Sequence, residues 1–69
     1  MIQIIDRDNN KYTLLINNNE YIFIPILLYK SNSLLPLKSF VPKGKSVIKW
    51  KVNGKQISYN QIKKAIRKN

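Results

Sequence analysis

Lysines are the residues of this chain best suited to bind a charged ligand, and five of them lie between Pro42 and Gln56, in the stretch PKGKSVIKWKVNGKQ. The stretch also holds the only tryptophan and both glycines. Successive side chains of a β-strand point to opposite faces, so a strand over 46–52 would separate odd from even positions. Lysines would line one face, and Ile48, Trp50 and Val52 would line the other. We therefore predict a strand that joins a cationic surface to the core. Trp50 belongs to the core in this interpretation, and stacking on a base is its alternative role.

A row of lysines suits the phosphate groups of a nucleic acid, which Lys and Arg contact without regard to sequence. Alternate residues of a strand repeat at about 6.6 Å, which is a reasonable spacing for successive phosphates of one strand. Lysine acts as a point charge rather than as a bidentate fork, so we expect backbone- and shape-driven binding with weak sequence preference. The predicted nucleic-acid-binding residues are Lys43, Lys45, Lys49, Lys51, Lys55, Lys63, Lys64, Arg67 and Lys68.

Composition excludes most catalytic chemistry. The chain has no cysteine and no histidine, so it offers neither a Cys–His nor a Ser–His pair and no zinc site of the usual kind. Its only carboxylate side chains are those of Asp6, Asp8 and Glu20. We expect a protein that is not an enzyme and that uses no metal and no cofactor.

Two short motifs resemble ion-binding loops only in part. The spacing Asp6-x-Asp8-x-Asn10 opens like a calcium loop, but its later positions lack the required glycine and glutamate. We interpret it as a hairpin turn. Gly44-Lys45 is shared with phosphate-binding loops, but the first glycine of that motif is missing and a strand is predicted to follow in place of a helix.

Charge is distributed unevenly along the chain. Thirteen basic and three acidic residues give a net charge of +10, and no acidic residue follows Glu20. A field of one sign favours a polyanionic partner, either nucleic acid or an acidic protein surface. Ile, Asn and Lys have A/T-rich codons, so a low-GC gene alone could raise the lysine content. Glutamate also has an A/T-rich codon yet occurs once, so the scarcity of acids points to function.

Alternating apolar residues and turn formers predict a mostly β fold of the α+β class. Strands are expected over about 2–6, 11–16, 20–29, 46–52 and 55–57, and a helix over about 59–68. Asn53-Gly54 is the strongest signal for a two-residue hairpin. Ser58 and Gln61 have the spacing of a capping box. We expect one domain over residues 1–69, either a small antiparallel sheet or an SH3-like, partly open barrel of about five strands, with the C-terminal helix packed on it.

The run over 20–29 is apolar on both of its faces and contains Pro25, which cannot donate to a strand ladder. One interpretation is a bent strand that serves two sides of a small barrel. The other is an edge strand that pairs with another chain. The interface residues would then be Tyr21, Phe23, Pro25, Leu27 and Tyr29. Pro36 interrupts 34–41, where we expect an irregular edge strand or an apolar loop.

In size, charge and order of elements the chain resembles small basic SH3-like barrels that end in a helix, such as archaeal chromatin proteins. The longest apolar run, 21–29, is far shorter than the about 20 residues of a membrane-spanning helix, and the N-terminus lacks a secretory pattern. We expect no membrane span and an intracellular location, either cytoplasmic or nucleoid-associated, or the host cytoplasm or virion if the protein is viral. The A/T-rich composition suits a phage or mobile-element protein.

Two functions fit these observations. The first is a small basic nucleic-acid-binding protein, acting on DNA or RNA. The alternative is a protein–protein interaction module without enzymatic activity, such as a phage accessory, an inhibitor or an assembly factor. It would dock on an acidic protein surface or form a homo-oligomer through the strand at 21–29.

Overall fold

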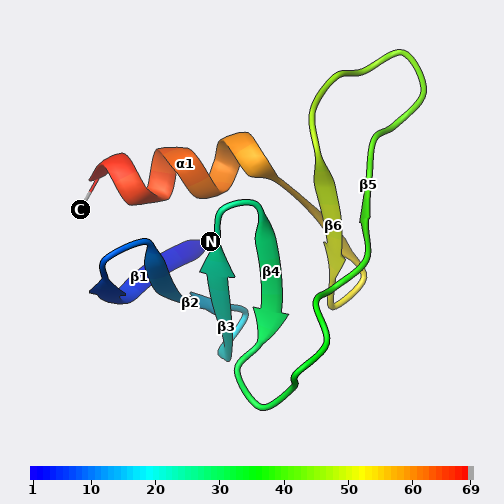
Figure 1. Ribbon diagram of the computed structural model, residues 1–69. Helices are drawn as coiled ribbons and strands as arrows, with labels where there is room; N and C mark the ends of the chain where they lie inside the picture. The colour runs from blue at the N-terminus through cyan, green and yellow to red at the C-terminus, as the bar shows by residue number, and fades with distance from the viewer. Residues whose placement is uncertain (69) are drawn as a thin grey trace.

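Two antiparallel sheets and one C-terminal helix make up the fold in the computed structural model, which describes residues 1–68 (Figure 1). The first sheet has the order β1 (Ile2–Asp8), β2 (Lys11–Ile16), β3 (Asn19–Ile24), β4 (Leu27–Lys30). The second has the order β5 (Ser39–Phe40), β6 (Lys49–Val52), β7 (Lys55–Ser58), and helix α1 (Tyr59–Lys68) follows directly. The predicted mostly β fold with a C-terminal helix is confirmed. The strands described form two sheets and no closed barrel, so the SH3-like barrel stays a prediction.

Asparagine and glycine residues set the tight turns that build both sheets. Asn17 and Asn18 have φ values of 50° and 65°, and they join β2 to β3 in a two-residue loop. Asn53 and Gly54 have φ values of 52° and 79° and join β6 to β7 in the same way, as predicted. Positive φ at both central residues defines the hairpin turn whose twist matches that of the flanking strands.

The single strand predicted over 20–29 is wrong, because the chain reverses at Pro25-Ile26. β3 and β4 pair antiparallel on either side of this turn, with Ile24 opposite Leu27. Proline has a fixed φ and no N–H, which makes it unsuited to the middle of a strand and suited to a turn. The apolar run therefore supplies two strands, each with one face toward the core and one face away from it.

The strand predicted over 46–52 is shorter in the structure, since β6 begins at Lys49. Upstream of it, Pro42–Lys45 forms a turn in which the Lys45 N–H donates to the Pro42 carbonyl oxygen at 3.0 Å. Gly44 has a φ of 76°, a conformation that favours glycine. Of the four alternating lysines, only Lys49 and Lys51 thus lie on a strand. The ambiguous stretch 34–41 holds the two-residue strand β5 and a single bridge from Pro36 to Tyr29.

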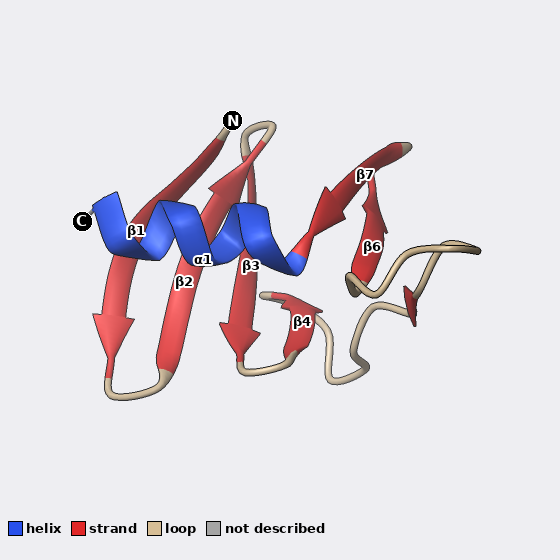
Figure 2. Cartoon of the chain, turned by 90° about the horizontal axis from the view of Figure 1, so that it is seen from above, coloured by secondary structure: helices blue, strands red, loops and turns tan. Residues whose placement is uncertain are grey.

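Helix α1 begins with the predicted capping box. The Ser58 N–H donates to Gln61 Oε1 at 2.7 Å, and the Gln61 N–H donates to Ser58 Oγ at 3.2 Å. The helix then crosses one face of the first sheet (Figure 2). Within this helix, Ile62 is fully buried in the core, and Ile66 packs against the same core.

Phe23 lies at the centre of an aromatic cluster that joins all parts of the fold. Its ring centroid is 6.4 Å from that of Tyr12 in β2, 6.1 Å from that of Trp50 in β6 and 5.9 Å from that of Tyr59 in α1. Such pairs contribute about 0.5–1.5 kcal/mol each beyond area burial. Trp50 is 1% exposed, which confirms its predicted place in the core.

Phe23→Ala is expected to remove a large part of the free energy of unfolding. Truncation of a buried phenylalanine costs about 3–5 kcal/mol, whereas a chain of this length has a free energy of unfolding of about 3–10 kcal/mol. Urea unfolding followed by far-UV circular dichroism measures the loss. Phe40→Ala is the matched control, because Phe40 is only half-buried, and we expect it to cost about 1 kcal/mol or less. Equal losses in the two variants would contradict the central role of Phe23.

Candidate nucleic-acid interface

The acidic residues all lie on one face of the first sheet, and that face points away from the helix. Residues directly opposite each other in an antiparallel pair share a face. Thr13 and Leu15 alternate with the buried side chains of β2, so they belong to the outer face. The acids stand opposite outer-face residues: Asp6 opposite Thr13, Asp8 opposite Lys11 and Glu20 opposite Leu15. The second sheet and the helix therefore carry no carboxylate side chain.

Lys49 and Lys51 mark the outer face of the second sheet. They alternate along β6 with Trp50 and Val52, which are both fully buried, so the two lysines point away from the core. Lys51 stands opposite Gln56 of β7. This arrangement follows the predicted parity and places two lysines, Lys49 half-buried and Lys51 exposed, about 6.6 Å apart along the strand on one outer face.

An aromatic side chain on this lysine face was missed by the sequence analysis. Phe40 of β5 stands directly opposite Lys49, so it shares the outer face with the two lysines. It is half-buried, and it is not one of the half-buried side chains that pack against the core within residues 1–68. Lys38, which is exposed, immediately precedes β5, and continuing the register by one residue brings it opposite Lys51. The only signal was the presence of one lysine, Lys38, within the mostly apolar stretch 34–41.

Lys43 and Lys45 lie on the long connection between β5 and β6, which projects from the body of the protein (Figure 1). Both side chains are exposed. Gly44-Lys45-Ser46 matches the last three residues of a phosphate-binding loop, but Ser39 stands where the first glycine belongs. The connection leads into β6 rather than into a helix, so it lacks the helix N-terminus that such loops use.

The remaining predicted cations are placed elsewhere. Lys55 lies just after the β6–β7 turn opposite Val52, on the side of the core rather than with Lys49. It is exposed because it sits at the end of the hairpin. The helix residues are also exposed, and Lys63 Nζ lies 5.3 Å from the centroid of the Tyr59 ring. The helix cations, which form a second basic surface, are Lys63, Lys64, Arg67 and Lys68.

The predicted interface at 21–29 is divided between two faces. Tyr21 and Phe23 are each 1% exposed and lie in the core, so neither is available to a partner. Leu27 is 47% exposed, Tyr29 is half-buried, and both lie on the outer face of the first sheet. Pro25 is exposed in the turn. The predicted single interface is wrong because the chain reverses at Pro25-Ile26, so these residues belong to two paired strands and not to one strand with two apolar faces.

Other side chains replace the two buried rings on that outer face. Ile22 stands opposite Tyr29, and Ile24, which is 39% exposed, stands opposite Leu27. Leu34 is 97% exposed and helps to line a depression of about 190 Å³ on the same side. We call this set the outer apolar patch; its members are Ile22, Ile24, Leu27, Tyr29 and Leu34.

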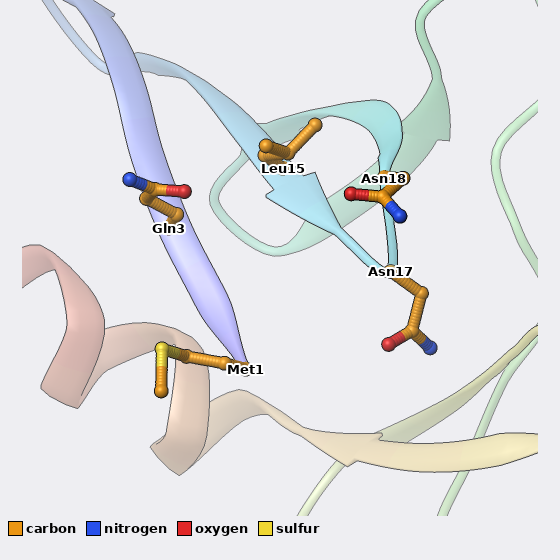
Figure 3. Close-up of a pocket in the computed structure, with 5 residues that line it drawn as sticks. All are labelled: Met1, Gln3, Leu15, Asn17 and Asn18. Carbon is orange, nitrogen blue, oxygen red and sulfur yellow. The ribbon is translucent and has the colours of Figure 1, made fainter.

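A further depression of about 300 Å³ opens between β1 and the β2–β3 turn (Figure 3). Its side chains spread around an open rim instead of converging on one point. The lining residues, Met1, Gln3, Leu15, Asn17 and Asn18, include no ionisable side chain. Across residues 1–68, no cluster of His, Cys, Asp and Glu side chains is suited to hold a metal ion. No helix in this described part has the length and apolar character needed to cross a bilayer.

Trp50 is expected to report folding and to be insensitive to a bound nucleic acid. Because its ring is buried against Phe23, its fluorescence emission should lie at shorter wavelength than in denaturant, and acrylamide should quench it weakly. Saturation with an oligonucleotide should leave the emission unchanged. Strong quenching by the oligonucleotide, with the fold intact by circular dichroism, would instead assign Trp50 a stacking role.

The site has to be interpreted from its own residues. No family model, no curated protein and no solved structure matches this chain. Function therefore rests on the register, burial and charge described above.

Proposed function

We propose that this protein binds nucleic acid without catalysis, using the outer face of the second sheet and the adjacent cations. The observation that carries the proposal is the separation of charge in space. All three acids lie on the outer face of the first sheet, whereas Lys49, Lys51 and the lysines of the β5–β6 connection lie on the second sheet and its loop. A polyanion can approach the second sheet without meeting a carboxylate side chain.

The chemistry of the surface indicates how it would bind. Its cations are lysines, which neutralise phosphates as point charges and impose little base preference. Lys43 and Lys45 extend the surface along the projecting connection, and the helix cations add a second contact region. We expect binding to the backbone with weak sequence preference, in the cytoplasm or on a nucleoid. An acidic protein surface is the competing partner.

The affinity for an oligonucleotide is expected to fall steeply with salt, and removing two charges should make the fall less steep. Each neutralised phosphate contributes about −0.7 to −0.9 to the slope of log K against log salt concentration. Lys49→Gln with Lys51→Gln should therefore reduce the slope by about 1.5. Charge reversal of the same two lysines should abolish binding while the fold survives. Fluorescence anisotropy over a salt series measures both effects.

Lys11→Gln with Lys30→Gln is the matched control. Lys11 stands opposite Asp8 on the acidic face and Lys30 ends β4, so this pair removes the same net charge from the first sheet. Its slope should equal that of the unmodified protein. An affinity that does not change with salt, or equal slopes for the two double variants, would contradict the proposed surface.

We also propose a second candidate function, self-association through the outer apolar patch. Helix α1 crosses the opposite face of the first sheet and so does not cover the patch (Figure 2). It is also where copies of a strongly basic protein repel each other least, since it carries all three acids. Two copies can bury their equivalent patches against each other in a two-fold arrangement. Four strands of about six residues span about 19 by 20 Å, so the whole outer face of the first sheet offers at most about 400 Å² per copy, against about 800 Å² in a standard interface. We therefore expect a concentration-dependent equilibrium rather than a permanent dimer.

Sedimentation velocity over a concentration series should show dimers whose population rises with salt. Salt screens the repulsion between copies, so the effect has the opposite sign to that on nucleic-acid binding. Leu27→Lys places a charge in the patch and should give monomers under all conditions. Val41→Lys, which adds the same charge at a residue 54% exposed at the start of the projecting connection, should leave the equilibrium unchanged. Monomers of the unmodified protein at high concentration and high salt would contradict self-association.

A further inference from the structure

Phe40 occupies a position that the needs of the fold do not explain. It is a large apolar side chain on the edge strand of the second sheet, and it shares a face with lysines rather than with Trp50. Its neighbour in the chain, Ser39, stands opposite Trp50 and takes the core-facing position. An aromatic ring in this position contributes little to the core and remains accessible from outside.

The groups around Phe40 are those that a single nucleic-acid strand requires. Lys49 lies directly across from the ring, and Lys51 lies two residues further along β6 on the same face. Gln56 stands opposite Lys51, so an amide that can both donate and accept hydrogen bonds completes the surface. An aromatic platform beside cations about 6.6 Å apart combines stacking with phosphate contacts.

We infer that Phe40 is a base-stacking residue and that the outer face of the second sheet binds single-stranded nucleic acid. The inference rests on the proposed function and specifies its ligand. One base stacks on the Phe40 ring while the phosphates beside it lie against Lys49 and Lys51. Gln56 is within the same surface and can reach the edge of a neighbouring base.

Stacking of a base on Phe40 would distinguish single-stranded from duplex ligands. In a duplex the faces of the bases are already occupied by their neighbours, so only an unpaired base can offer its face to Phe40 without a cost in unstacking. The lysines do not make this distinction, because both ligands carry phosphates. A preference for single strands must therefore depend on the aromatic ring.

The test is fluorescence anisotropy with one labelled 12-nucleotide oligonucleotide, single-stranded and as a duplex with its complement. The unmodified protein should bind the single strand more tightly. Phe40→Leu should weaken single-strand binding by about 5- to 150-fold, the equivalent of one lost stack, and should weaken duplex binding far less. The salt slope should not change, because no charge is removed. Phe40→Tyr should retain the preference.

Leu35→Ala is the control, since Leu35 is 76% exposed on the connection between β4 and β5, outside both proposed surfaces, and its truncation should change neither affinity. Circular dichroism and thermal unfolding establish that each variant is folded. Unchanged single-strand affinity in a folded Phe40→Leu protein would overturn the stacking role while leaving the proposed function intact if the Lys49 and Lys51 variant still lost affinity. An equal loss on both ligands would also overturn it. The absence of any binding by the unmodified protein would overturn the proposed function itself.

Discussion

The packing of Phe23 against three other aromatic rings is the interaction on which the rest of this structure depends. Tyr12 comes from the first sheet, Trp50 from the second and Tyr59 from the helix, so one side chain of β3 contacts all three parts of the fold. The chain has no cysteine and so no disulfide to hold these parts together. A chain this short buries only about 60% of its unfolded surface, so large aromatic side chains are an effective way to join two small sheets.

The same packing determines where charge can lie. Trp50 must face Phe23, so its neighbours Lys49 and Lys51 must face outward, because β6 alternates its side chains. On the first sheet, the inward positions of β2 and β3 are filled by core residues, which leaves the acids on the opposite face. The polarity of the molecule, with one acidic and apolar surface and one cationic surface, thus follows from the parity of strands that share one core.

Local signals in the sequence predicted local features well. The asparagine turns, the Asn53-Gly54 hairpin and the Ser58 capping box depend on a few adjacent residues, and all three form as expected. The hairpin at Pro25 was mistaken for a strand because a fully apolar run does not reveal which residues face inward. An irregular edge strand was one of the two alternatives expected over 34–41, and β5 is such a strand. Its exact position and register could not be predicted, since its two residues acquire strand geometry only by pairing with β6 nine positions later in the chain. The outward position of Phe40 follows from this pairing, and the burial of Tyr21 follows from its register opposite Leu14 of β2.

Phe40 and Trp50 show why residue type alone is a poor guide to which aromatic side chain faces outward in a small protein. Tryptophan is the stronger stacking residue in isolation, yet its register on β6 directs it into the core, where no base can reach it. Phe40 belongs to a strand too short to be detected from its pattern, yet its pairing with Lys49 directs it outward. Trp50, which has the larger apolar surface, therefore packs in the core, and Phe40 lies on the outer face beside the lysines. A binding surface of this kind can be recognised only once the partner strand of each aromatic residue is known.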